Sequence, residues 1–105
     1  DVPAEPLGTP AQAAALLPLV LDRANAMLVA ECAGAAEALL DLTLEHLRTR
    51  RQFGAPLAKF QALQHRVADQ AIALEQLKSM ACVAALALEA GDAAARTRGV
   101  AAARV

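Results

Sequence analysis

Two long stretches rich in alanine and leucine, residues 19–51 and 58–90, are separated by a short break that contains Gly54 and Pro56. Alanine and leucine are strong helix formers, and a glycine followed by a proline is typical of a helix end. Each stretch is therefore predicted to form one helix. Because long helices joined by a short turn pack antiparallel, the expected fold is an all-α antiparallel helical bundle.

Each predicted helix carries apolar residues on more than one side. The first helix has two stripes, formed by Leu28, Cys32, Ala35, Leu39 and Leu42 and by Leu40, Leu44 and Leu47. The second helix has one face formed by Phe60, Leu63, Val67, Leu74, Leu77 and Ala81, extended by Ile72, Met80, Val83 and Leu86. Two stripes on one helix indicate burial on two sides, so the chain is expected to self-associate. Gly34, within the first helix, predicts a close approach of another helix.

The N-terminal segment is predicted from its prolines. Residues 1–10 are rich in proline and are expected to be an extended connector from an upstream domain that the sequence lacks. Residues 11–17 are expected to form a short helical lead-in. Pro18 is expected in the first turn of the next helix, where its missing N–H costs nothing.

Residues 11–105 are expected to form one helical bundle domain. Its third helix is predicted to begin near Ala93, with Asp92 as the N-cap. Neither a glycine cap nor a proline precedes Val105. We therefore expect this helix to continue to the last residue and the domain to be truncated at its C-terminal end.

Composition and charge exclude several classes of function. The net charge of −1 argues against broad nucleic-acid binding. The sequence has no uncharged apolar run of about 18 residues, so no membrane span is expected. The lack of a visible signal peptide favours the cytoplasm. Cys32 and Cys82 are expected to be buried thiols. Ser79 is the only serine, and His46 and His65 fall in different helices, so neither a catalytic triad nor a metal site is predicted.

The break between the two helices combines positive charge, amides and an aromatic ring. It includes Arg48, Arg50, Arg51, Gln52, Phe53 and Gln61. Cations are favourable at the end of a helix, which is one sufficient reason for the arginines. A guanidinium also offers bidentate donors to a phosphate. The residues alone therefore allow two interpretations, a stabilised helix end or a dinucleotide site with the pyrophosphate on arginine and the adenosine against the ring.

The order of residues from Arg50 to Asp69 resembles a known protein family. It runs Arg50-x-Gln-Phe-Gly-x-Pro-Leu-x-x-Phe-Gln-x-x-Gln-His-x-x-Ala-Asp, and it is similar to the C-terminal helical domain of the acyl-CoA dehydrogenases. The resemblance extends upstream to Leu21-Asp22 and Ala33-Gly34. Downstream it covers Leu74-Glu75 and the third helix, so it spans nearly the whole chain.

The resemblance implies a fragment of the four-helix C-terminal domain of an FAD-dependent enzyme that oxidises acyl-CoA thioesters at the α and β carbons. Members of the family are mostly tetramers, and an electron-transfer flavoprotein is an acceptor that the resemblance allows. By the same resemblance, Arg50 contacts the pyrophosphate of an FAD held mainly by the neighbouring subunit. Gln52, Phe53 and Gln61 lie at the same shared FAD site.

The chain also departs from the family pattern. The glutamate that serves as the base in most members lies beyond the third helix, and the position of an alternative glutamate is Ala24 here. No catalytic residue is therefore assigned, and the isolated chain is expected to be inactive. Many members carry Asp-x-x-Arg near the start of the first long helix. Here Asp22 is followed by Asn25 at the matching position, and these two residues are the candidates for substrate contacts.

Two functions remain open at this point. The chain is either part of an active acyl-CoA dehydrogenase, or a catalytically inactive family-like subunit or assembly module. The inactive subunit or assembly module would associate with copies of itself or with a related subunit. The sequence Asp-x-x-Asn, where many members of the family have Asp-x-x-Arg, favours this second alternative. Neither function predicts a metal ion.

Overall fold

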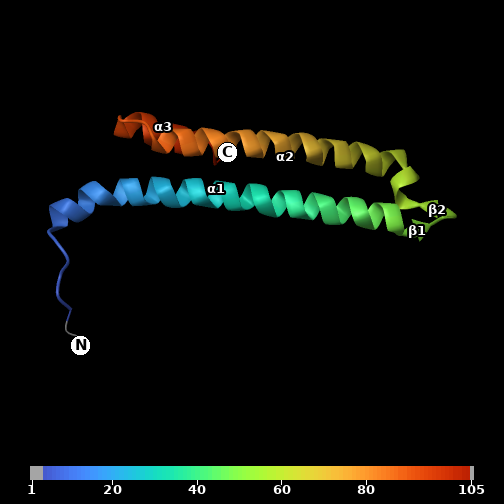
Figure 1. Cartoon of the computed structure of the whole chain (residues 1–105), viewed down its shortest axis with the longest axis horizontal. Helices are drawn as coiled ribbons and strands as arrows, with labels where there is room; N and C mark the ends of the chain where they lie inside the picture. Colours follow the sequence, from blue (N-terminus) through green and yellow to red (C-terminus); the bar gives the residue numbers. More distant parts are fainter. Residues whose placement is uncertain (1–3, 105) are drawn as a thin grey trace.

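The computed structural model describes residues 4–104, which form three α-helices, a short hairpin and one 3-10 turn (Figure 1). The elements are α1 (Pro10–Thr49), β1 (Arg51–Gln52), β2 (Ala55–Pro56), η1 (Leu57–Lys59), α2 (Gln61–Leu88) and α3 (Ala93–Ala102). Figure 1 shows α1 and α2 side by side and antiparallel, with the hairpin at one end and α3 at the other. The predicted all-α class is confirmed.

The first helix begins earlier than predicted and is not interrupted. Thr9 caps α1, because its hydroxyl accepts from Gln12 N at 3.3 Å while Gln12 Oε1 accepts from Thr9 N at 2.8 Å. Pro10 occupies the first turn, and Pro18 lies inside the helix. The separate lead-in and the first-turn place of Pro18 are therefore wrong, since this capping box starts the helix two turns earlier.

The N-terminal residues before α1 are exposed and not helical over residues 4–9. Their role as a connector stays a prediction, and residues 1–3 lie outside the described part of the chain. At the other end, Asp92 caps α3 as expected, since its carboxylate accepts from Ala94 N at 3.2 Å and Ala95 N at 2.9 Å. α3 ends at Ala102, so the expectation that it continues to Val105 is wrong over the described residues.

Close helix packing occurs at Gly99 rather than at Gly34. A Cβ built on Gly99 would lie 2.6 Å from Ala87 Cβ, which is shorter than real Cβ contacts, so only glycine lets α3 approach α2 this closely. A Cβ on Gly34 meets nothing within 4 Å, so the close approach predicted there does not form within this chain.

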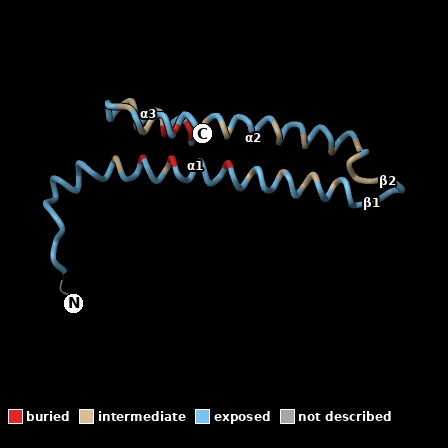
Figure 2. Tube along the Cα trace, viewed as in Figure 1, coloured by how far each residue is buried: buried red, intermediate tan, exposed pale blue. Residues whose placement is uncertain are grey.

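The core is small and lies where the three helices meet. It consists of Ala26 and Val29 of α1, Ala84 of α2 and Ala103 after α3, and half-buried Leu77, Met80, Ala81 and Leu88 pack against it. Figure 2 shows the buried residues gathered at the α3 end of the helix pair. The Cα atoms span 68 × 38 × 16 Å, so the molecule is long and thin.

The second apolar stripe of α1 is half-buried as expected, but the first is exposed. Leu39 and Leu42 are 64% and 62% exposed, and Leu28 is also exposed. Both cysteines are exposed, so the expectation of buried thiols is wrong. Cys32 and the exposed leucines share one physical reason: α2 and α3 cover one side of α1, and among residues 4–104 nothing covers its other apolar side. Cys82 lies on an exposed side of α2.

Two helices of the described chain, α1 and α2, are long and apolar enough to cross a membrane by length and composition alone. In each helix, a window of 18 residues has a mean hydropathy of 1.5. The buried share of that window is 17% in α1 and 11% in α2. The expectation of no membrane span applied the stricter test of an uncharged run, and it stays a prediction. Core helices of soluble proteins meet the same criterion of length and composition, so the observation does not decide the matter.

An exposed ion pair joins the middle of α1 to α2. Lys78 Nζ donates to Glu37 Oε1 at 2.6 Å and lies 3.5 Å from Glu75 Oε1. The hydrogen bond to Glu37 raises the pKa of Lys78 above its ordinary value of 10.5. Because the pKa is raised on folding, the charged lysine stabilises the folded chain, and this stabilisation is complete at pH values below 10.5. It is lost as the pH rises through the pKa of Lys78 in the folded chain. The pair is therefore intact at neutral pH, although solvent weakens it.

Candidate functional site

The segment between α1 and α2 is a tight antiparallel hairpin. α1 ends at Thr49, and the Arg50 N–H donates to the His46 carbonyl at 2.8 Å. Arg51 pairs with Pro56 and Gln52 pairs with Ala55. Leu57 N then donates to the Arg50 carbonyl at 2.9 Å, which closes the hairpin on the end of α1. The sequence predicted a helix stop here but not the two short strands.

The tip of the hairpin presents an aromatic ring in an unfavourable backbone conformation. Phe53 and Gly54 have φ of 54° and 76°, and positive φ at both central residues is what a type I′ turn requires. Glycine adopts this region freely, but a residue with a side chain pays about 1–2 kcal/mol. Phe53 is nevertheless 88% exposed. Strain that places an apolar ring in solvent is more readily explained by binding than by packing.

The ring of Phe53 is held from one side by a second aromatic residue. Its centroid lies 6.1 Å from that of Phe60, with the ring planes at 87°, which is an edge-to-face arrangement. Phe60 is half-buried and immediately precedes α2. The hairpin tip is thus fixed relative to the start of α2, and the outer side of the Phe53 ring is free to contact a ligand.

A 3-10 turn connects the hairpin to α2. The η1 turn contains three residues, and the Gln64 side chain reaches back from α2 so that its Nε2 donates to the Ala58 carbonyl at 2.8 Å. Gln61 is the first residue of α2 and is exposed. Its amide therefore lies at the positive end of that helix, beside the hairpin.

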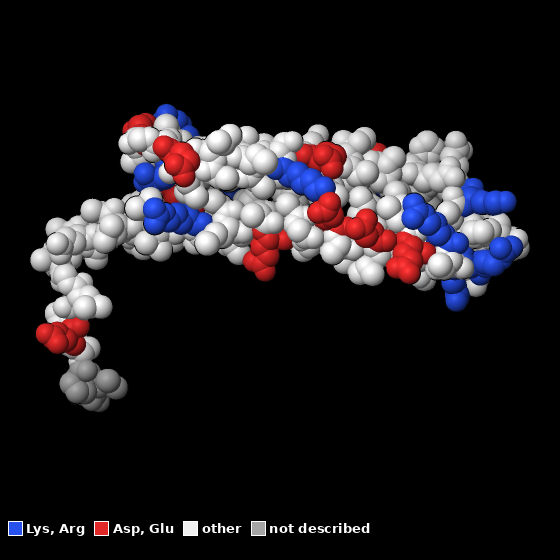
Figure 3. Space-filling view, in the orientation of Figure 1, with Lys and Arg blue, Asp and Glu red and all other residues white. Residues whose placement is uncertain are grey.

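Positive charge gathers at the hairpin end of the molecule, as Figure 3 shows. The cationic residues of this region are Arg48, Arg50, Arg51, Lys59 and Arg66. Acidic residues occur instead along the preceding turns of α1, at Glu37, Asp41 and Glu45. Arg50, Gln52, Phe53 and Gln61 are all exposed at the positive end. The four predicted cofactor contacts are thus brought together by the fold, and their assignment to a cofactor stays a prediction.

The two predicted substrate contacts lie near the opposite end of α1. Asp22 is 5% exposed, and its Oδ2 accepts from Arg96 Nε at 3.0 Å and from Thr97 Oγ1 at 2.9 Å. Asn25 is half-buried one turn further along the helix. Asp22 therefore already has two partners on α3, which the sequence did not indicate because they are 74 and 75 residues away. Its role as a substrate contact stays a prediction.

A groove of about 430 Å³ lies beside this buried ion pair. Its lining is largely apolar and includes Asp22, Asn25, Thr97 and Arg104. At 1.5 Å per residue, Asp22 and Arg50 are roughly 40 Å apart along α1. The hairpin and this groove are therefore separate regions, and one compact ligand cannot contact both.

The described residues contain no cluster of metal-ligating side chains. Among residues 4–104, no group of three or more His, Cys, Asp or Glu side chains is placed to hold a metal ion. The chemistry available at the hairpin is instead that of binding: guanidinium groups and amides for an anionic, polar ligand, and a ring for a flat one.

The comparisons with known proteins agree with the resemblance in the sequence. The family described as the C-terminal domain of acyl-CoA dehydrogenase matches residues 16–105. Acyl-CoA dehydrogenase IpdE2 of Mycobacterium tuberculosis is 52% identical over 52 residues, which is 50% of this chain and 16% of that protein. The mitochondrial short-chain specific acyl-CoA dehydrogenase of Bos taurus is 35% identical over 80 residues, 76% of this chain and 19% of that protein.

A third relative is a dehydrogenase whose name does not refer to acyl-CoA. The L-prolyl-[peptidyl-carrier protein] dehydrogenase of Pseudomonas fluorescens is 40% identical over 68 residues, covering 65% of this chain and 18% of that protein. The chain thus spans less than a fifth of the length of each of these three relatives. No solved structure matches the chain.

Proposed function

Because this chain belongs to the acyl-CoA dehydrogenase family and represents part of its C-terminal domain, we propose that it supplies one side of a shared FAD site in an acyl-CoA dehydrogenase. The observation that carries this proposal is the hairpin tip. A strained and exposed Phe53 lies in the same hairpin as Arg50, which suits a ligand with both a flat ring and a charged group.

The residues of the hairpin fit the parts of FAD by their chemistry. Arg50 would bind the pyrophosphate through its guanidinium donors. Gln52 and Gln61 would donate and accept hydrogen bonds at polar groups of the cofactor, and Phe53 would pack against the adenosine. When bound, FAD supplies the two-electron oxidation of the α and β carbons of the thioester. The chain's own part is to bind and orient the cofactor.

The separation of the two predicted sites supports a shared arrangement. Asp22 and Asn25 are the candidates for contact with the acyl-CoA, but they lie roughly 40 Å along α1 from Arg50. The hairpin and the substrate groove of one chain would then serve different active sites. We propose that the hairpin reaches the FAD held by a neighbouring subunit, in a homotetramer or with a related subunit, and that the enzyme acts in the cytoplasm without a membrane span.

Flavin analysis of the full-length protein tests this function. We expect the purified protein to contain FAD, identified by chromatography after release, and to reduce an electron-acceptor dye when an acyl-CoA thioester is added. An electron-transfer flavoprotein would replace the dye in the cell. A full-length protein that neither contains nor takes up FAD would contradict the proposal.

The same experiment addresses the inactive alternative, which the substitution of Asn25 in the Asp-x-x-Arg pattern favours. An inactive subunit or assembly module would retain FAD but would not reduce the dye with any acyl-CoA. If the enzyme is active, we propose that the base that removes the α-proton lies outside residues 1–105, since no residue of this chain is assigned to that step.

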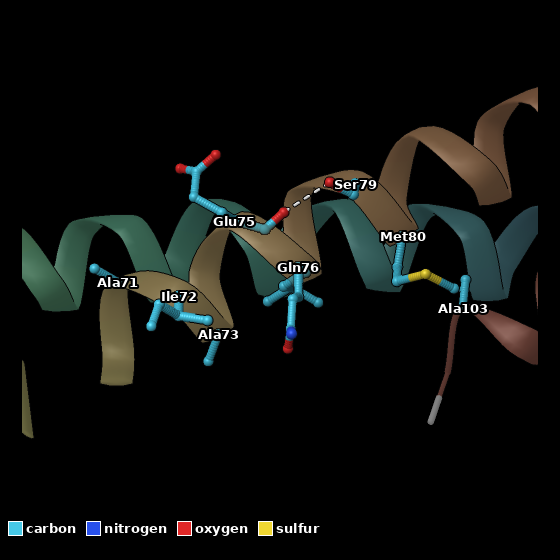
Figure 4. Close-up of a pocket in the computed structure, with 9 residues that line it drawn as sticks. Ala71, Ile72, Ala73, Glu75, Gln76, Ser79, Met80 and Ala103 are labelled. Atoms are coloured by element: carbon cyan, nitrogen blue, oxygen red, sulfur yellow. Dashed lines mark hydrogen bonds between the residues drawn. The ribbon is translucent and has the colours of Figure 1, made fainter. Parts of the chain in front are cut away.

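Self-association is the second part of the proposed function. Besides the exposed stripe on α1, a groove of about 930 Å³ runs along α2 to the end of α3. Figure 4 shows Ile72, Gln76, Met80 and Ala103 bordering this groove. Exposed apolar surface of this extent is typical of an interface. Other helices of the same or a neighbouring subunit would cover it.

We expect a Leu39→Glu, Leu42→Glu double variant to dissociate the assembly of the full-length protein. Both leucines are more than half exposed within the chain, and burying a carboxylate against an apolar partner is strongly unfavourable. Sedimentation equilibrium would measure the change in mass. Ala30→Glu is the control, because Ala30 is exposed and, at about 100° per residue, lies on the opposite side of α1 from Leu39. An unchanged mass in the double variant would contradict this interface.

A further inference from the structure

The Gln64 side chain makes a contact that the cofactor-binding residues depend on. Its Nε2 donates to the Ala58 carbonyl at 2.8 Å, so it joins the first turn of α2 to η1 across six residues. Resting on the proposed function, we propose that Gln64 is a positioning residue, which fixes the hairpin in the direction that lets Arg50 and Phe53 meet FAD.

The η1 turn has Leu57 and Ala58 half-buried against the two long helices, but its own hydrogen bonding is limited. It is three residues long, and turns of this type are weakly stable because their hydrogen bonds have poor geometry. Its N-cap, Pro56, makes no side-chain capping bond. At its other end the Phe60 N–H donates to the Leu57 carbonyl at 3.1 Å. Within the described residues, the side-chain hydrogen bond to this turn comes from Gln64.

The contact passes to the hairpin through neighbouring backbone bonds. Two residues after Ala58, the ring of Phe60 packs against that of Phe53 with the centroids 6.1 Å apart. Immediately before Ala58, the Leu57 N–H donates to the Arg50 carbonyl at 2.9 Å. Both cofactor contacts are therefore tied to η1. If η1 is mobile, FAD binding must also order the hairpin. The entropy cost of that ordering lowers the affinity for FAD.

Gln64 is also placed between the two long helices. A cavity of about 290 Å³ beside it is lined by Leu47, Arg48, Ala58 and Val67, among others. The side chain thus adjoins the end of α1, the turn η1 and the start of α2. A donor at this junction links η1 to α2 beside the end of α1. Gln61, three residues earlier, is exposed and makes no side-chain hydrogen bond among residues 4–104.

The test replaces the amide while keeping the shape of the side chain. Gln64→Met removes the donor, and Gln64→Glu provides only acceptors when ionised. In the full-length apoprotein, titrated with FAD and followed by flavin fluorescence, we expect both variants to bind roughly threefold to tenfold more weakly at about pH 8, as the loss of one neutral hydrogen bond predicts. Gln70→Met is the control, because Gln70 is exposed on α2 with no hydrogen bond in the described structure.

A pH series separates a hydrogen bond from a general packing effect. A glutamic acid has an ordinary pKa of about 4.3, and its protonated form can donate to the Ala58 carbonyl. The loss in Gln64→Glu, relative to wild type, should therefore shrink as the pH is lowered toward about 4, where an ordinary glutamic acid is mostly protonated, whereas the loss in Gln64→Met should not. The neighbouring charged or titratable residues Arg48, Lys59, His65 and Arg66 are present in every variant, so each affinity is compared with that of wild type at the same pH.

Three outcomes would overturn the inference. Wild-type affinity in both Gln64 variants would overturn it, and so would a loss in Gln64→Glu that is constant over the pH series. A loss in Gln70→Met equal to that in Gln64→Met would also overturn it, since the effect would not be specific to the turn. If wild-type protein binds no FAD at all, the proposed function fails instead. Weakened binding in both Gln64 variants, recovered by acid only in Gln64→Glu, supports the positioning role.

Discussion

Replacing Arg50 with alanine is expected to weaken FAD binding by the full-length protein roughly tenfold to hundredfold. Hydrogen bonds to charged groups are worth about 1.5–3 kcal/mol, and each 1.4 kcal/mol is a factor of ten. The backbone of Arg50 donates to His46 and accepts from Leu57, and alanine retains both bonds. The hairpin should therefore persist, and the loss should appear in the FAD dissociation constant rather than in the unfolding transition.

Arg51→Ala is the matched control for this prediction. It removes the same charge from the same hairpin, one residue further along, where the side chain points to the other face of the strand. A specific pyrophosphate contact predicts a much smaller loss for Arg51→Ala. Equal losses in the two variants would show that net positive charge, rather than the geometry of Arg50, attracts the cofactor. Unchanged binding in Arg50→Ala would refute the contact.

Asp22→Ala is expected to lower the free energy of unfolding by about 3 kcal/mol. Removing one partner of a buried ion pair costs about 3–5 kcal/mol because the other charge remains buried without compensation. The side chains of Asp22 and Arg96 are 7% and 14% exposed, so the lower end of the range applies. Thr97 also loses its acceptor. Urea denaturation followed by circular dichroism, at a concentration that keeps the oligomeric state constant, would measure the change.

Glu37→Ala provides the comparison for Asp22→Ala, because it breaks an ion pair of similar length between exposed side chains. Solvent screens such a pair, so its removal should have only a small effect on unfolding. A large loss of stability in Asp22→Ala with little change in Glu37→Ala would assign Asp22 a structural role. If both variants unfold alike, the burial of the Asp22–Arg96 pair contributes nothing special to stability.

The class of fold could be predicted from the sequence because helix propensity and period dominate it. The residues at which each helix begins and ends could not be predicted exactly, since several nearby residues offer competing start and stop signals. Pro18 is a strong local signal for a helix start, yet the capping box at Thr9 and Gln12 begins α1 before it. Cys32 was expected inside because thiols are usually buried, but burial depends on which helices are available to cover that side of α1.

The candidate site was predictable in its residue types but not in its geometry. The order of arginine, amides and phenylalanine is visible in the sequence, whereas the positive φ of Phe53 is not, because a bulky residue rarely adopts that conformation. The partners of Asp22 were missed for a different reason. Arg96 and Thr97 are distant in sequence, and only the folding back of α3 brings them to α1.

The hairpin also has a consequence for the order in which the chain folds. α1 and α2 leave it in opposite directions, so the sequence separation of bonded residues grows with distance from it, from 6 for Gln64–Ala58 to 41 for Lys78–Glu37 and 74 for Arg96–Asp22. Closing a longer loop costs more entropy. The helices are thus expected to zip together from the hairpin, so that the segment proposed to meet the cofactor becomes ordered early and the contacts at the α3 end form last.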